Sequence, residues 1–143
     1  RKKYPKSKLP PAVIFPDTSE IWDEAVNYTI NRFSENPGSL SKERLYPITH
    51  KEANDWHEQF LTYRFYDFGI YEDAMVKESS ILNHSILSPL MNVGLILPIE
   101  IINRTLYFSV EEDIPINSTE GFIRGAAWHP YTFALHGRRS HKA

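Results

Sequence analysis

The sequence predicts an all-α fold, and three observations carry this prediction. Apolar residues recur at helical spacing in several segments, these segments begin at capping residues or prolines, and no convincing strand-length alternation of polar and apolar residues appears. At 143 residues the chain has the length of one domain, and its 41% of hydrophobic residues can form a sizeable core. We therefore expect one helical domain without a sheet.

The chain is predicted to begin with an extended linker over residues 1–16. Residues 1–12 are basic and rich in proline, which lacks a backbone donor and disfavours helix in the residue before it. The apolar segment 12–15 is expected to pack against the rest of the domain. A helix should follow, capped by Asp17 with Glu20 as its reciprocal partner. One face of that helix is expected to be buried, at Trp22, Val26, Ile30 and Phe33.

A second helix is predicted from Thr49, which forms a capping box with Glu52. The aromatic run 63–68 then leads to Gly69, which we expect to end the stretch. Aromatic residues at this density favour a core over a surface that stacks on a ligand. The remaining helices are expected at 71–76, at 85–93 with Pro89 in the first turn, from Pro98 to the acidic residues 111–113, and at 117–124.

The segment 84–89, HSILSP, is the first candidate for a binding site. It places hydroxyl groups directly before an apolar run, where a helix start would offer unpaired N–H donors to a phosphate. A serine-rich helix start is more often only a cap, so the residues alone favour a structural role.

Composition excludes several classes of function. The chain has no cysteine, so it can hold neither a disulfide nor a cysteine-ligated metal or iron–sulfur cluster. Its formal net charge of -2 gives no argument for a nucleic-acid or membrane partner, and the basic residues near both ends are interpreted as solvated tails. No secretory signal and no apolar run of membrane-spanning length is visible, which predicts a cytoplasmic protein.

The histidines and carboxylates form no recognisable catalytic or metal motif. His50, His57 and His84 match no spacing of metal ligands, so we interpret them as surface or capping residues and assign no metal site. No arrangement of Ser, His and Asp indicates a nucleophile, and we assign no catalytic residue.

Three motifs in order carry a resemblance to a known family. They read FGIYEDAM at 68–75, HSILSPLMN at 84–92 followed by Gly94, Leu95 and Pro98, and NSTEGFIR at 117–124. Together they resemble the photolyase/cryptochrome superfamily, specifically its bacterial branch with an iron–sulfur cluster, (6-4) photolyases included. The resemblance covers residues 1–124. It implies that residues 13–124 are the first part of the family's helical FAD-binding domain, with orthogonal helix packing, and that the chain is a fragment.

The resemblance also implies a cofactor site and a partner. The FAD pyrophosphate or ribityl region would be contacted by His84, Ser85, Ile86, Leu87 and Ser88, and Tyr71 matches a tyrosine that reaches a phosphate in relatives. His84 stands where many members have threonine. The full-length protein would bind FAD and DNA, as a photolyase (a carbon–carbon lyase) that repairs pyrimidine photoproducts or as a light sensor. We expect this chain alone to be inactive, because later helices of the family supply the flavin-ring contacts and the cluster cysteines.

The tail 125–143 departs from the family pattern, which continues with a Gly-Trp-Arg-Glu stretch. Here the sequence is GAAWHP, and Pro130 is expected to break a helix, so we interpret the tail as foreign to the family. The alternative to the flavoprotein hypothesis is a non-catalytic helical interaction module, which would self-associate through its exposed apolar surface.

Overall fold

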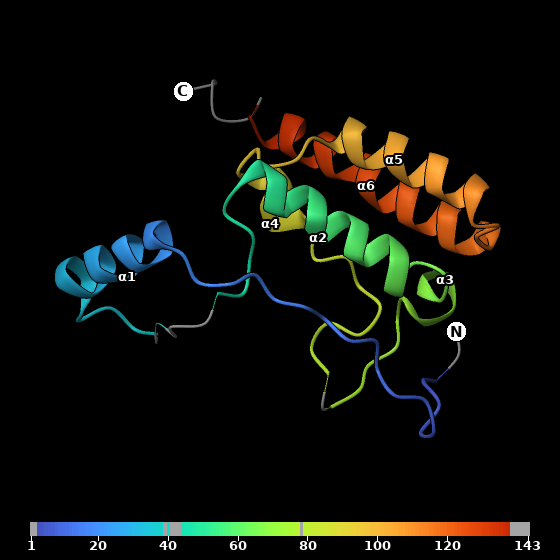
Figure 1. Ribbon diagram of the computed structural model, residues 1–143. Coiled ribbons are helices and arrows are strands. Elements are labelled where there is room, and N and C mark those ends of the chain that lie inside the picture. The colour runs from blue at the N-terminus through green and yellow to red at the C-terminus, as the bar shows by residue number, and fades with distance from the viewer. Residues whose placement is uncertain (1–2, 39, 41–43, 78, 138–143) are drawn as a thin grey trace.

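The computed structural model describes the backbone of residues 3–38, 40, 44–77 and 79–137, and side chains as far as residue 127. Within these residues the fold is all-α, as predicted, and contains no strand (Figure 1). The helices are α1 (Glu20–Phe33), α2 (His50–Tyr63), α3 (Phe68–Tyr71), α4 (Ser88–Asn92), α5 (Pro98–Glu111) and α6 (Ile116–Gly137).

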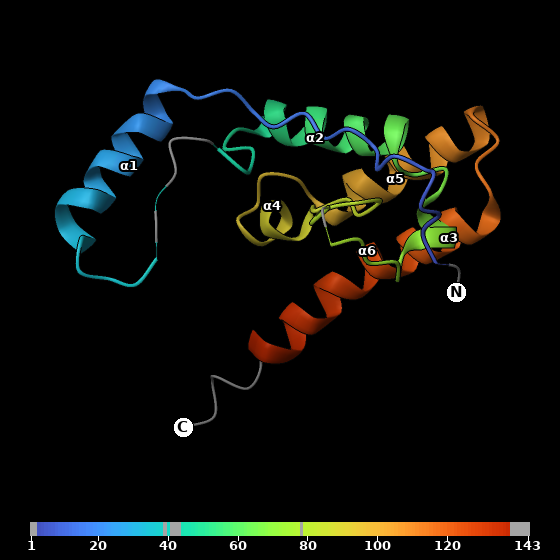
Figure 2. The same cartoon turned by 90° about the horizontal axis from the view of Figure 1, so that it is seen from below.

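The helices fall into a packed unit and a separate arm. Helix α5 packs against both α2 and α6, and the short α3 packs against α6. Helix α1 lies apart from this unit in both views, joined to it by extended segments (Figures 1 and 2). The core therefore forms among segments from residue 53 onward, with one contribution from Val13 in the linker.

Phenylalanine rings form the centre of the core. The ring of Phe122, on α6, lies 4.7 Å from Phe60, 5.6 Å from Phe65 and 5.7 Å from Phe68, measured between centroids. Tyr63 from the same aromatic run is exposed. The expectation that this run is core thus holds for its phenylalanines, since the helical turn directs Tyr63 outward.

Gly69, which follows the aromatic stretch, lies within α3 and joins it to α6. Its N–H donates to Ser118 Oγ at 2.9 Å, and this hydroxyl donates in turn to the Tyr66 carbonyl at 2.9 Å. A β-carbon at residue 69 would lie 2.6 Å from the backbone of Asn117 and Ser118. Only glycine permits this close approach of two backbones.

The linker packs against α2, as predicted for segment 12–15. The side-chain amide of Gln59 donates to the Ile14 carbonyl and its oxygen accepts from the Ile14 N–H, both at 2.9 Å. The ring of Phe15 lies 6.0 Å from Trp56. The backbone of Ile14 is thus held by two hydrogen bonds from the single side chain of Gln59.

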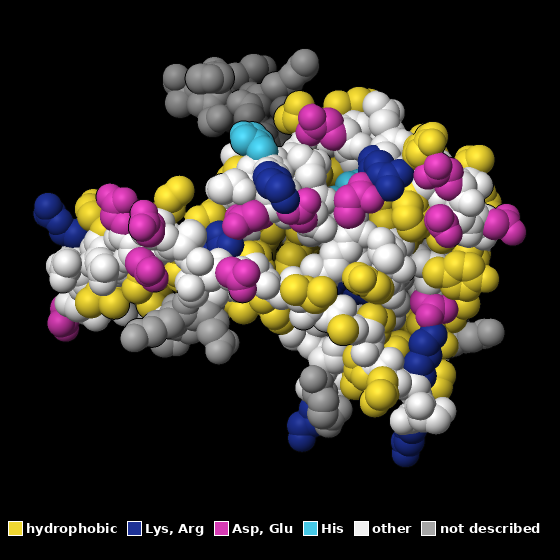
Figure 3. Space-filling model, in the orientation of Figure 1, with side chains coloured by type: hydrophobic (Ala, Val, Ile, Leu, Met, Phe, Trp, Pro, Cys, Tyr) yellow, Lys and Arg dark blue, Asp and Glu magenta, His cyan; other side chains and the backbone are white. Residues whose placement is uncertain are grey.

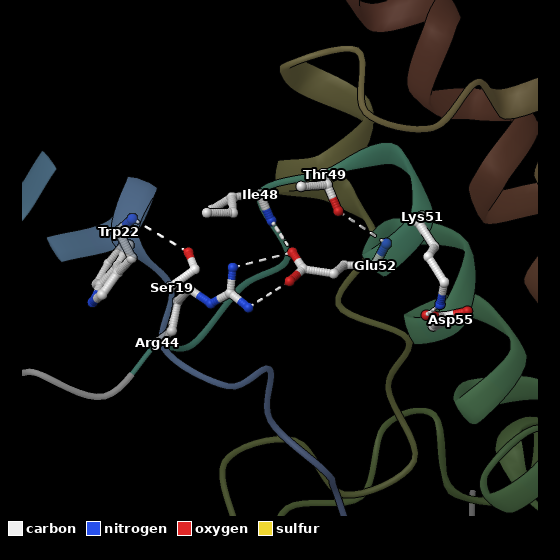
Figure 4. A network of polar contacts seen from close by, with 8 residues as sticks. All are labelled: Ser19, Trp22, Arg44, Ile48, Thr49, Lys51, Glu52 and Asp55. Atoms are coloured by element: carbon white, nitrogen blue, oxygen red, sulfur yellow. Dashed lines mark hydrogen bonds and ion pairs between the residues drawn. The ribbon is translucent and has the colours of Figure 1, made fainter. Parts of the chain in front are cut away.

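Helix α1 begins and packs differently from the prediction. Ser19 is the capping residue in place of Asp17, and its Oγ accepts from the Trp22 N–H at 3.4 Å (Figure 4). None of its residues is buried, so the predicted burial of its apolar face was wrong. Periodicity shows which face of a helix is apolar, but it contains no information on whether a neighbour covers that face.

Helix α2 begins at Thr49 as predicted, since Thr49 Oγ1 accepts from the Glu52 N–H at 3.2 Å. The Glu52 carboxylate also accepts from the Ile48 N–H at 2.9 Å and from the two terminal nitrogens of Arg44 at 2.6 and 3.1 Å (Figure 4). A bidentate pair with a buried arginine therefore fixes the start of this helix.

Three further boundaries differ from the prediction. The helix expected at 71–76 is α3 at 68–71, and the one expected at 85–93 begins only at Ser88, because Leu82 and Ile86 have left-handed φ values of 50° and 54°. Helix α6 does not end at Arg124; it continues through Pro130 to Gly137, so the expected break was wrong. Ala126 of the proposed foreign tail is part of the core.

Candidate ligand cavity

One cavity of about 470 Å³ lies beside the core of the packed unit. Its walls come from the segment that leads into α4, from Phe68 on α3, Ile101 on α5 and Phe122 on α6, with Tyr46 at its margin. This volume lies within the range of about 300–1,000 Å³ that is usual for small-molecule sites. The cavity is thus a candidate binding site on size and position.

Five of the six residues predicted to contact a cofactor line this cavity. His84, Ser85 and Ile86 are half-buried there, Leu87 is buried and Ser88 is exposed. Tyr71 is the exception, because it does not appear among the lining residues. Its ring lies 4.8 Å from Tyr4 and under the ammonium group of Lys8, which is 5.1 Å from the ring centroid. Tyr71 therefore holds the linker in this structure.

The segment that forms the cavity wall is strained and firmly anchored. Ile86 adopts a left-handed φ of 54°, which is unusual for a β-branched residue. The indole N–H of Trp56 donates to the Ser85 carbonyl at 2.8 Å, and the Asn83 side-chain amide donates to the Arg64 carbonyl at 3.1 Å. Trp56 of α2 and Arg64 at its C-cap thus hold the backbone segment that carries Ser85 and leads to Ser88.

The helix start proposed as a phosphate site does not have the expected geometry. Helix α4 begins at Ser88, has five residues and lacks a side-chain cap at Leu87. So short a helix has little dipole to offer an anion. Any phosphate contact in this cavity must therefore come from hydroxyls, from single backbone N–H groups or from a cationic side chain outside this helix.

The lining suits an uncharged ring system better than an anion. Most of the lining side chains are aliphatic or aromatic, and the polar ones are Tyr46, His84, Ser85 and Ser88. No lysine or arginine is found among the described lining residues. A flavin ring or the ribityl chain fits this chemistry through apolar contact and hydroxyl hydrogen bonds, whereas a pyrophosphate would lack a positive partner at the cavity surface.

His57 lies behind the cavity in the core, so its assignment to the surface was wrong. Its Nε2 is 3.1 Å from Thr105 Oγ1, and its ring stacks 6.4 Å from that of the cavity residue Phe122. Burial lowers the pKa of His57 from 6.5 to about 4. The imidazole is therefore neutral at physiological pH and acts as a packed core residue.

Sequence reasoning missed the cavity residues outside the 84–88 segment. Phe68 and Phe122 were visible as parts of motifs, and Ile101 as part of an apolar face, but nothing in the sequence pointed them toward one cavity. Gly121 also lines it, where a β-carbon would lie 3.1 Å from Glu72 Oε2. Gly125 and Ala126 belong to the tail that was set aside as foreign.

The face of the molecule drawn in Figure 3 carries charges of both signs without a large patch of either. Arg104 pairs with Glu58 through two hydrogen bonds of 2.6 and 2.7 Å, which lower the pKa of Glu58. Among described residues no group of three His, Cys, Asp or Glu side chains is placed to hold a metal ion. No described helix is long and apolar enough to cross a membrane.

Comparison with known proteins gives two similarities. The chain is 30% identical to a (6-4) photolyase of Agrobacterium fabrum over 120 residues, which are 83% of this chain and 23% of that protein. It is 33% identical over 69 residues to an uncharacterized protein of Acanthamoeba polyphaga mimivirus, covering 47% of this chain and 53% of the viral protein. No family model matches. The similarity to a photolyase agrees with the three motifs, while the assignment to an iron–sulfur branch stays a prediction.

Proposed function

We propose that this chain forms one wall of the FAD site of a photolyase-like or cryptochrome-like protein. The observation that carries the proposal is the cavity lined by residues 84–88, the same segment that the motif resemblance marks as a cofactor contact. The photolyase similarity spans 83% of the chain. Because the chain covers only 23% of that photolyase, DNA binding, light-driven repair and cytoplasmic location are parts of the proposal.

The cavity chemistry assigns roles to individual residues. Ser85 and Ser88 offer hydroxyls to the ribityl chain or a phosphate, and Phe68 and Phe122 offer apolar contact to a ring. FAD itself would supply the redox chemistry, and the chain would bind and orient it. The chain would supply only one wall of the FAD site, a cavity of about 470 Å³. We therefore expect weak binding of FAD by this chain alone.

The first test is a titration of FAD into the wild-type chain and a Ser85→Ala/Ser88→Ala variant, followed by flavin fluorescence. The variant should lose about tenfold in affinity, since each lost hydrogen bond contributes about 0.5–1.5 kcal/mol. A Ser7→Ala/Ser109→Ala variant, with both serines away from the cavity, should bind like wild type. FAD binding that is tight and unchanged by the double substitution would contradict the site assignment.

Repair activity is tested in the same samples by illumination with a lesion-bearing oligonucleotide under reducing conditions. Repair requires a flipped base beside the flavin ring and a pocket that receives it. We expect no repair by this chain alone. Measurable repair would show that the chain is a complete photolyase unit.

A second candidate function is a helical interaction module, favoured by one observation. Helix α1 buries none of its residues and leaves four large apolar side chains exposed, Ile21, Tyr28, Ile30 and Phe33. A purified chain that is folded, carries no flavin and shows a concentration-dependent mass in sedimentation would support this candidate over the first.

A further inference from the structure

Arg64 is a buried cation whose guanidinium has no hydrogen-bond partner among the described residues. It forms the C-cap of α2, its exposed fraction is 1%, and Nε, Nη1 and Nη2 are all unpaired. Burying an unpaired charge is strongly unfavourable, because the lost hydration is not replaced. A guanidinium in this state is suited to an anionic partner that joins the protein from outside.

The aromatic rings around Arg64 leave its donors free. Its guanidinium carbon lies 5.7 Å from the centroid of Trp56 and 5.8 Å from that of Phe60. Such cation–π contacts stabilise the charge through the face of the guanidinium and use none of its N–H groups. The planar fork of donors, which matches a phosphate or carboxylate in two bonds, is therefore available.

Arg64 does not line the candidate cavity, but it is joined to the segment that leads into the cavity wall. The carbonyl of Arg64 accepts from Asn83, whose own Oδ1 is also buried and unpaired, and Trp56 beside it donates to Ser85. The intervening segment is flanked by the left-handed residues Leu82 and Ile86. Left-handed backbone is strained in residues with a β-carbon, and the segment is held in this conformation by these two hydrogen bonds. A ligand in the cavity therefore reaches Arg64 only when the two hydrogen bonds open.

We propose that Arg64 binds the phosphate groups of the ligand in this cavity once the segment 82–86 moves aside. This proposal rests on the proposed function and deepens it, because the described cavity lining has no lysine or arginine to meet a pyrophosphate. The ligand class is a pyrophosphate ester such as FAD. The hydroxyl of Ser88, which lies outside the segment that moves, then contacts the ligand from the cavity side, and Arg64 contacts it from the opposite side.

The test compares the affinities of FAD and riboflavin for the wild type, Arg64→Met and the control Arg104→Met. Methionine retains the length and apolar packing of the side chain and removes a buried unpaired charge, so the variant should fold. Arg64→Met should lose about tenfold or more in FAD affinity, as expected for hydrogen bonds to a charged group, and bind riboflavin like wild type. Arg104→Met removes an arginine paired with Glu58 away from the cavity, and should leave both affinities unchanged.

Inorganic pyrophosphate provides a readout that does not depend on flavin. It should raise the melting temperature of the wild type and of Arg104→Met, and leave that of Arg64→Met unchanged. If no flavin binds but this Arg64-dependent stabilisation is present, the flavin proposal fails and the assignment of Arg64 stands.

Two outcomes would overturn the assignment of Arg64. One is FAD affinity and pyrophosphate stabilisation in Arg64→Met equal to those of wild type. The other is no effect of pyrophosphate on any variant together with no FAD binding. Should Arg64→Met not fold, Arg64→Lys replaces it: lysine keeps the charge without the planar fork, and an FAD affinity equal to wild type would then contradict a bidentate phosphate contact.

Discussion

Helices α1 and α2 are equal in length and opposite in environment. Each has 14 residues, a hydroxyl residue at its N-cap and an apolar face. Yet α2 buries Ala53, Trp56, His57, Phe60 and Leu61, and α1 buries none of its residues. Amphipathic sequence therefore creates the capacity for burial, and the rest of the chain decides whether that capacity is used.

The difference comes from where partner segments approach. Helix α2 receives the linker on one side, α5 on another and Phe122 of α6 at its centre. Helix α1 is followed by a loop that returns to α2, and the Arg44–Glu52 pair fastens that loop at the start of α2 (Figure 4). The arm is thus attached near its base, and its apolar face stays open.

The largest expected effect separates the two regions by one matched pair of substitutions. Phe122→Ala removes the ring at the centre of the core and should lower the free energy of unfolding by about 3–5 kcal/mol. Phe33→Ala in the arm removes a ring that is 50% exposed, and should change it by no more than about 0.5 kcal/mol. Urea unfolding followed by circular dichroism measures both.

Equal losses from the two substitutions would break the comparison, because they would mean that α1 contributes to the same cooperative unit. A Phe122→Leu variant serves as the intermediate case. It retains much of the apolar volume, and its loss should fall between the other two.

The next effect is a dependence of stability on pH that belongs to the packed unit alone. His57 has a pKa of about 4 in the folded protein and about 6.5 when unfolded, so the unfolded chain binds its proton more readily. The stability it provides is complete above pH 6.5 and falls as the pH drops toward 4, by at most about 1.4 kcal/mol per unit.

Unfolding in urea at several pH values between 7 and 4 measures this slope, in wild type and in His57→Gln. Glutamine can still reach Thr105 and does not titrate, so the slope should become shallower in this window. Asn54→Ala, at an exposed residue of α2 that does not titrate, should keep the wild-type slope. An unchanged slope in His57→Gln would contradict the buried neutral imidazole.

The smallest effect compares the two caps. Thr49→Ala should lower the free energy of unfolding by about 1 kcal/mol, because α2 loses its cap within the cooperative core. Ser19→Ala removes an equivalent cap from α1 and should reduce the helix content of the arm while leaving the urea midpoint of the core unchanged. A shift of that midpoint by Ser19→Ala would show that the arm and the core unfold together.

Local signals in the sequence located several features correctly. The all-α class, the Thr49 cap, Pro98 at the start of α5 and the packing of segment 12–15 all follow from propensity, periodicity and backbone chemistry. Such signals act over a few residues, so they can be recognised in a single amino-acid sequence. The motif at 84–88 likewise marked a segment that lines a cavity, although its use by FAD stays a proposal.

Long-range contacts decided what local signals could not. The packing of α3, α5 and α6 places Phe68, Ile101 and Phe122 around that cavity. The same packing leaves Tyr71 outside it. The burial of His57 and Arg64 and the exposure of α1 depend in the same way on which surfaces find a neighbour. A residue's own spacing fixes its direction on a helix, but its burial, its pKa and its partners are set by segments distant in sequence, and these become known only when the chain is folded.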